Sequence, residues 1–492
     1  MSTYQRNTRI VIRIFILAMV LLNALVPSPA SAHSLSSVNQ QTVSCSTSGD
    51  LLVANGETCS LAAGPYTFSD ITIQTGGTLI LLGNPSSNQG VTINTGDMTI
   101  EAGGKINANG TGYSSGGPGA GTGAIWTGGG AGHGGIGESG DGAGGSGYGL
   151  ATSPVALGSN GGSGRCGLIS TCPGGAGGGA IKLQVSNTLL IDGEISADGL
   201  VGGGRAGGGS GGSIWIDTNT LGGSGTIHTN GGNGSNGGGD GAGGRIAIYY
   251  SNSTFPLDTG HIFSRGAFTT NSNGGGPGTV YLKDNTSGAN KVVVNNAGNN
   301  VTTYAVHPVG NYSYDQIELG GMATLRIVGS DSRFTLTGND ILIGDGTGKL
   351  AVEGTIITPQ DLVLSNVSLT ILGNIEGAQN ITLEAPGVLE LYATSPLHTG
   401  SYSFTSITVR NGATLKLVSS GNGDTDYSND PGVKLNLANL TVESGGKVSA
   451  DGTGYPGAHE SGTGPGAGKS AWATGGGGGH GGYGQNAAGA GG

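Results

Sequence analysis

One loop of the sequence groups three carboxylates that could hold a metal ion. Asp424, Asp426 and Asp430 lie in the segment Gly421–Gly432, and hard oxygen ligands at alternating positions can surround Ca²⁺. The segment lacks the later glutamate of helix–loop–helix calcium sites, and the corresponding loop of an internal repeat, Gly83–Gly90, carries no acid. We therefore name the three aspartates as candidate calcium ligands, the one cofactor contact that the sequence suggests. An ordinary solvated turn is the favoured interpretation.

The four cysteines form two local pairs. Cys45 and Cys59 are 14 residues apart, and Cys166 and Cys172 are six apart. An even number in local pairs suits an oxidising compartment, and zinc would need a four-ligand cluster that no CxxC or nearby histidine pair supplies. The spacing predicts the disulfides Cys45–Cys59, at the start of the fold, and Cys166–Cys172, within a glycine-rich loop. Free thiols are the alternative.

Two tryptophans are candidate glycan contacts. Trp126 and Trp472 occupy equivalent positions beside glycine-rich tracts, and an aromatic face can stack on a sugar ring. The favoured alternative is that each ring covers glycine backbone and closes the tract against the strands.

No catalytic residue is predicted. The sequence has no Gly-x-Ser-x-Gly elbow on a strand-to-helix turn, and Gly468-Lys-Ser470, the nearest approach to a phosphate-binding loop, lies in a glycine tract. His133 and His480 recur in equivalent tracts and are expected to be polar loop side chains. With 19 basic and 30 acidic residues the formal net charge is −11, which argues against a nucleic-acid partner.

The N-terminus predicts export. The apolar run Ile14–Val26 is preceded by three arginines and no acid, and small residues stand at Ala30 and Ala32, as signal peptidase requires. We expect a signal peptide at 1–32 and a secreted protein, extracellular or at the cell surface. The run is short for a bilayer span, although an uncleaved anchor is the alternative, and no transmembrane segment is expected in the mature chain.

A long internal repeat organises the chain. Tyr66–Ile73 returns 336 residues later as Tyr402–Val409, and Gly103–Tyr113 returns 342 residues later as Gly445–Tyr455. The second copy reaches Gly492 within its first glycine-rich tract, so we expect the sequence to be a fragment of a longer repeat protein.

A shorter repeat lies inside the long one. The motif [Ile/Val]-x-[Ala/Thr]-[Asp/Asn]-Gly occurs at 106–110, 195–199, 227–231 and 448–452. Alternating apolar residues before it predict half-buried strands, and its last two residues predict a tight corner with a left-handed backbone. Helix signals are nearly absent.

Glycine accounts for 107 of the 492 residues, without the three-residue period of collagen. It is concentrated in the tracts 111–180, 201–212 and 231–244. Each tract follows the same corner, so we expect these loops to stack on one side of the strands. Both an ordered glycine-rich layer and floppy loops are compatible with this pattern.

Short apolar strands recur through residues 300–450, for example at 317–319, 325–328 and 362–364. Coils of about 20–25 residues would bury them by stacking. The pattern resembles the right-handed parallel β-helix of pectin-lyase-like proteins and of exported, glycine-rich bacterial adhesins, with a β-sandwich array as the alternative. The expected organisation is an N-terminal cap at 33–65, a first long repeat at 66–400 and the start of a second at 401–492.

The resemblance implies an exported, non-catalytic structural or adhesin-like protein of the cell surface or extracellular matrix. Its expected partners are surface glycans or other matrix proteins. A polysaccharide lyase or hydrolase on the same scaffold is one alternative, but it would need a basic residue among acidic calcium ligands on adjacent layers, whereas charges here are sparse along the chain. An ice- or glycan-binding solenoid is another, although threonine forms no regular ranks.

Overall fold

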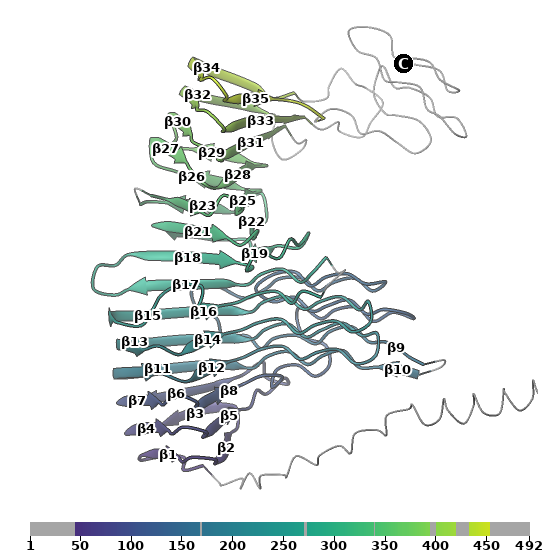
Figure 1. Ribbon diagram of the computed structural model, residues 1–492, viewed down its shortest axis with the longest axis vertical. Helices are drawn as coiled ribbons and strands as arrows, with labels where there is room; N and C mark the ends of the chain where they lie inside the picture. Colours follow the sequence, from purple (N-terminus) through teal and green to yellow (C-terminus); the bar gives the residue numbers. More distant parts are fainter. Residues whose placement is uncertain are drawn as a thin grey trace, which may run out of the picture. The chain divides into compact units, whose positions relative to one another are not determined.

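The computed structural model describes residues 45–167, 170–269, 273–338, 340–393, 400–419 and 432–452 (Figure 1). Within these ranges the chain forms strands, turns and extended segments with no helix. Nearly all strand pairs are parallel, so the predicted all-β class is confirmed. No helix in the described ranges has the length and apolar character of a membrane span.

The first stack of strands runs from β1 to β17 and has two parallel sheets. One sheet contains β1 (Leu51–Val53), β3 (Gly64–Thr67), β4 (Asp70–Ile73), β6 (Val91–Thr95), β7 (Asp97–Ile100), β11 (Ala180–Ile191), β13 (Ser213–Gly223), β15 (Arg245–Ser253) and β17 (Thr279–Asp284). The other contains β2 (Thr58–Leu61), β5 (Thr78–Leu81), β8 (Lys105–Asn107), β12 (Glu194–Ser196), β14 (Thr226–His228) and β16 (Ile262–Phe263).

Register explains why these segments stack. Alternate residues of a strand point to one face, and the parallel pairing places equivalent residues of successive strands directly over one another. One such column of buried aliphatic side chains consists of Val91, Ile181, Ile214, Ile246 and Val280. Each strand is too short to bury its apolar face alone, so stacking supplies the core.

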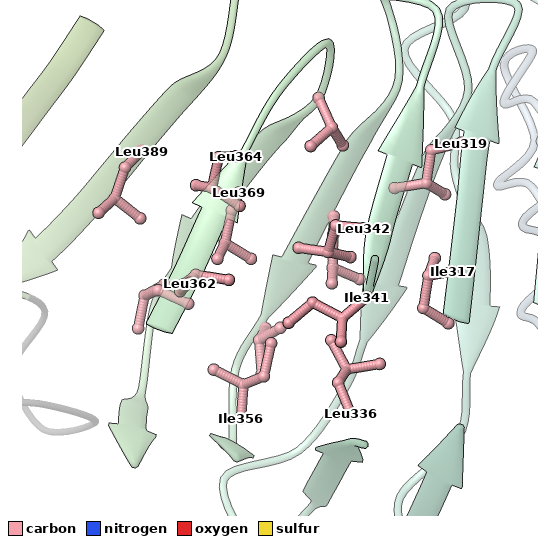
Figure 2. Packing of buried hydrophobic residues seen from close by; sticks show 14 of the residues in the cluster. Ile317, Leu319, Leu336, Ile341, Leu342, Ile356, Leu362, Leu364, Leu369 and Leu389 are labelled. Atoms are coloured by element: carbon pink, nitrogen blue, oxygen red, sulfur yellow. The ribbon is translucent and has the colours of Figure 1, made fainter. Parts of the chain in front are cut away.

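A second stack follows, with three further groups of parallel strands. The first sheet continues through β18 (Asn290–Asn295), β21 (Gln316–Gly320) and β24 (Leu342–Gly344). Beside it lie β19 (Ala305–His307), β22 (Thr324–Ile327), β25 (Lys349–Val352), β28 (Ser368–Ile371), β31 (Val388–Ala393), β33 (Thr414–Ser419) and β35 (Lys447–Ser449). Two four-stranded sheets complete this stack. One contains β20 (Asn311–Tyr314), β23 (Arg333–Leu336), β26 (Thr355–Ile357) and β29 (Asn374–Glu376). The other contains β27 (Asp361–Leu364), β30 (Asn380–Leu383), β32 (Ser401–Val409) and β34 (Lys434–Val442). Figure 2 shows buried side chains of this stack, Leu319, Leu342 and Leu362 among them, gathered between the strands that carry them.

The two stacks meet at an antiparallel pair, which departs from the expectation of one parallel coil through residues 66–400. Strands β17 and β18 pair antiparallel, with Val280 opposite Val293 and Tyr281 opposite Val292. Val280 and Val293 belong to the core of the first stack, whereas Tyr281 and Val292 belong to the core of the second. The same sheet therefore buries one face in the first stack and the opposite face in the second. Reversing the strand direction and exchanging the core face together amount to a half-turn about the stacking direction.

The glycine-rich tracts form a layer held by backbone hydrogen bonds, as far as they lie in the described ranges. The amide of Gly207 donates to the carbonyl of Gly162 (2.9 Å), and the amide of Gly162 donates to that of Gly129 (2.8 Å). The amide of Gly239 donates to the carbonyl of Gly128 (2.8 Å), which joins a later tract to the first. Segments from different tracts therefore pack side by side, and they leave the strands on the side of β8, β12 and β14 (Figure 1). Of the two alternatives for these tracts, the ordered layer is the one observed.

The repeated corners match the predicted left-handed backbone at two of their four positions. Gly110 and Gly452 adopt positive φ values of 64° and 65°, but the glycines of the other two corners do not. Gly199 is required because a Cβ there would collide with the carbonyl of Gly209. At the first three corners the residue before the glycine links one corner to the next. The amide of Asp198 donates to Oδ1 of Asn109 (2.6 Å), and the amide of Asn230 donates to Oδ1 of Asp198 (2.6 Å).

Candidate functional site

The structure places only part of the residues that the sequence singled out. The candidate calcium ligands Asp424, Asp426 and Asp430 lie outside the described residues, as does Trp472. Within the described ranges, no three His, Cys, Asp or Glu side chains are arranged to share a metal ion. The disulfides Cys45–Cys59 and Cys166–Cys172 are both present, and Trp126 lies at the surface.

Trp126 marks an aromatic and cationic site, which we call the Trp126 tip, formed by Trp126, Arg165 and Arg205. The Trp126 side chain is 50% exposed. The guanidinium carbon of Arg165 lies 4.3 Å from the centre of its ring, and that of Arg205 lies 6.0 Å away. Three separate segments therefore meet here. Trp126 and Arg165 come from the first glycine-rich tract, and Arg205 comes from the second. The site was only partly predicted, because nothing in the sequence links either arginine to the tryptophan.

Backbone contacts and a disulfide hold the Trp126 tip in place. The amide of Arg165 donates to the carbonyl of Trp126 (3.0 Å), and the amide of Gly128 donates to the carbonyl of Arg205 (3.0 Å). Arg165 lies on β9 (Gly164–Cys166), which pairs antiparallel with β10 (Ser170–Cys172), and the Cys166–Cys172 disulfide closes this hairpin. In Figure 1, β9 and β10 lie at the end of the glycine-rich segments farthest from the stacked strands.

The charged residues of the stack are paired across layers, which sequence reasoning missed. Lys105, Glu194 and Thr226 occupy one register column of β8, β12 and β14, and Lys105 Nζ lies 3.1 Å from Glu194 Oε2. In the second stack the carboxylate of Glu390 accepts from Lys349 (2.8 Å) and Lys416 (3.2 Å). For Lys105 and Glu194 the detectable signal was their position just before a copy of the repeated strand motif, since equal positions in a stack become neighbours.

His228 is the most strongly perturbed member of these pairs. Its Nδ1 lies 2.9 Å from Asp198 Oδ1 and its Nε2 lies 3.5 Å from Glu194 Oε1, while Phe263 stacks on its ring with centroids 5.1 Å apart. Burial by itself would lower the pKa of His228, but hydrogen bonds to Asp198 and Glu194 outweigh it and raise the pKa to about 9. The hydrogen bond from His228, opposed by burial and aided by Lys105, lowers the pKa of Glu194 to about 2. The imidazolium is thus charged at neutral pH, which suits a structural ion pair rather than a general base.

Replacing His228 with glutamine is expected to lower stability in a pH-dependent way. The folded-state pKa of His228 lies above its usual 6.5, so its contribution is fully present below pH 6.5 and is lost as the pH rises towards 9. The folded-state pKa of Glu194 lies below its usual 4.5, so the ion pair is weakened again as the pH falls below 4.5. Between these limits we expect a loss of about 2 kcal/mol in the free energy of unfolding, measured by denaturant titration.

The control for this measurement is His261→Gln, because the His261 side chain pairs with a single, largely exposed carboxylate, that of Asp258. It is expected to change stability by less than about 1 kcal/mol. A His228→Gln deficit that stays constant from pH 6 to pH 10 would contradict the ion-pair assignment.

Besides the His228 cluster, a polar group around Arg245 is buried where the glycine-rich layer meets both stacks. The Arg245 side chain is fully buried. Its Nε donates to the carbonyl of Tyr148 (2.8 Å), its Nη1 to Thr279 Oγ1 (3.0 Å) and its Nη2 to the carbonyl of Val306 (2.8 Å). Burial lowers the pKa of Arg245 to about 10, so the group remains charged at neutral pH.

His133, which the sequence predicted to be a polar loop side chain, lies in a loop and is buried in this group. Its Nδ1 donates to the carbonyl of Gly211 (2.8 Å), and its ring stacks on Tyr148 with centroids 4.4 Å apart. Burial, aided by the charge of Arg245, lowers the pKa of His133 to about 3 and has the same effect on His307. Both rings are therefore neutral at physiological pH. The sequence hid this role because a histidine among glycines resembles a surface loop.

Comparison of the chain with protein-family models, with curated proteins and with solved structures gives no match in any of the three. The class of protein is therefore argued from the fold and from the Trp126 tip.

Proposed function

We propose that this chain is an exported, non-catalytic, adhesin-like structural protein of the cell surface or extracellular matrix. The observation that carries the proposal is the Trp126 tip, an exposed aromatic ring beside two guanidinium groups at the end of a hydrogen-bonded glycine-rich layer. Exposed aromatic rings with polar neighbours suit contact with glycans. A stack of strands sets the distance of such a site from its base, since each layer adds about 4.8 Å.

We further infer that each stack coils as a right-handed parallel β-helix. Parallel strands in one sheet, joined through other elements, take right-handed connections in nearly all known cases. The long runs of parallel pairs and the aliphatic columns support this inference. Two disulfides and the absence of a membrane-spanning helix from the described ranges are compatible with an extracellular location.

The pairing of charges supports a scaffold rather than an enzyme. Proton transfer needs a base and a charge-stabilising partner close to one reacting atom. Lys105 and Lys416 each pair with a carboxylate of a neighbouring layer instead, and Lys349 pairs with Glu390 two layers away. These charges therefore stabilise the stack.

The proposal is tested by incubating the full chain with insoluble acidic and neutral polysaccharides, with and without Ca²⁺. We expect the protein to be retained on at least one of them while no unsaturated uronate or new reducing end is released. Cleavage that a single Arg or Lys substitution abolishes would overturn the non-catalytic assignment.

A further inference from the structure

The two arginines of the Trp126 tip make it a cationic site in an acidic protein. The chain carries a formal net charge of −11, yet Arg165 and Arg205 lie within 6.0 Å of the same indole ring. Arg205 is exposed, and its guanidinium forms no hydrogen bond or ion pair with the described residues. The local charge is thus opposite in sign to that of the whole molecule.

Acidic groups near the tip are engaged with the protein. Asp141 accepts hydrogen bonds from the amide (3.1 Å) and hydroxyl (2.9 Å) of Thr127, the residue after Trp126. Glu138 and Asp240 are buried inside the glycine-rich layer, where Glu138 Oε2 accepts from the amide of Asp240 (2.9 Å). Of these three carboxylates, only Asp141 is exposed to compete for the guanidinium groups.

The backbone positions of the two arginines are preorganised. Arg165 Nε donates to the carbonyl of Gly167 (2.6 Å) within the disulfide-closed hairpin. A Cβ on Gly204, the residue before Arg205, would lie 2.7 Å from Cys172 Sγ, so this segment packs directly on the disulfide. A site fixed in this way loses little conformational entropy on binding.

We propose that the Trp126 tip binds anionic polysaccharide, with Arg165 and Arg205 contacting carboxylate or sulfate groups and the indole ring contacting an apolar sugar face. Guanidinium groups pair with such oxyanions through charge-assisted and often bidentate hydrogen bonds. Aromatic rings supply apolar contact area at little entropic cost. This inference rests on the proposed adhesin-like function and adds the chemical class of its ligand.

The test measures affinity of the full chain for polygalacturonate, dextran sulfate and neutral dextran of matched length. We expect binding to both charged polymers, weakened by added salt because exposed charges are screened. Arg165→Gln/Arg205→Gln is expected to weaken it at least about tenfold. The matched control, Arg333→Gln/Arg410→Gln, removes the same number of charges from surface ion pairs with Glu376 and Glu384 and should leave affinity within about twofold.

A second variant distinguishes loss of a ligand contact from unfolding of the β9–β10 hairpin. Arg205→Gln removes an exposed guanidinium while leaving the backbone contacts and the disulfide in place, and it is expected to weaken binding about threefold to tenfold. Preference of polygalacturonate over dextran sulfate, or the reverse, identifies whether carboxylate or sulfate is the better ligand, and either result supports the proposal.

Other results would overturn this inference. These are equal binding of neutral dextran, unchanged affinity in both arginine variants, no retention of any charged polymer, or equally tight binding of double-stranded DNA. Binding that does not depend on charge would contradict the proposed ligand class but not the proposed adhesin-like function. Polysaccharide cleavage would contradict the adhesin-like function even if the protein preferred charged polymers.

Discussion

Replacing Arg245 with methionine is expected to lower the free energy of unfolding by about 3–5 kcal/mol, the range for breaking a buried, hydrogen-bonded charge. The guanidinium donates to the carbonyls of Tyr148 and Val306 and to the hydroxyl of Thr279. Methionine fills similar space but leaves these buried acceptors without donors, and each one costs free energy. The loss should appear as a lower denaturation midpoint.

The place where hydrogen exchange accelerates distinguishes the linking role of Arg245 from a general loss of packing. Arg245 joins the glycine-rich layer to the second stack, so amide hydrogen exchange should accelerate around Tyr148 and Val306 before it does so at the buried strand β5. Arg333→Met is the control, because Arg333 forms a surface pair with Glu376 that contributes less than about 1 kcal/mol. Equal stability of the two variants would show that Arg245 does not link the layers.

Replacing Gly207 with alanine is expected to disrupt the glycine-rich layer, at a cost of about 3 kcal/mol, the upper part of the range for over-packed sites. The new Cβ would collide with the carbonyl of Gly129 and lie 2.8 Å from the amide nitrogen of Gly130. Both are backbone atoms, which cannot rotate away as a side chain would. Gly207 also donates to Gly162 and accepts from Gly175, so a shift would weaken bonds to two neighbouring segments.

The measurement is hydrogen exchange of amides in the layer, followed by limited proteolysis. Gly432→Ala is the control, because a Cβ at Gly432 would have no atom of the described residues within 4 Å and its φ is not in the left-handed region. We expect the control to match the wild-type chain. Unchanged protection in Gly207→Ala would mean that the layer accommodates side chains and that its glycines are not required by packing.

Both variants also bear on the proposed function. The Trp126 tip depends on segments of the glycine-rich layer, since Gly128 and Arg205 are joined by a backbone hydrogen bond. Loosening the layer should therefore reduce polysaccharide binding even though neither Arg245 nor Gly207 belongs to the tip.

The local pattern of the chain was sufficient to predict its strands and disulfides. Alternating residues such as Ile181, Leu183 and Val185 lie on one buried face, because alternation is a property of the strand itself. The cysteine pairs were equally local, being 14 and six residues apart. The corner residues were located correctly, but the ladder from Asn109 through Asp198 to Asn230 depends on stacking and not on the single turn.

Only the tertiary structure revealed contacts between residues that are distant in sequence, and the buried face of strands in which neighbouring residues are all apolar. In β17 and β18, Val280, Tyr281, Val292 and Val293 are all apolar, so alternation cannot tell which face is the core, and the exchange of faces was hidden. The meeting of Trp126 with Arg165 and Arg205, and the burial of Arg245, follow from the packing of glycine backbones. Because glycine has no side chain, its tracts carry no periodic signal of the faces that they present. Their neighbours are therefore set by hydrogen bonds between distant segments.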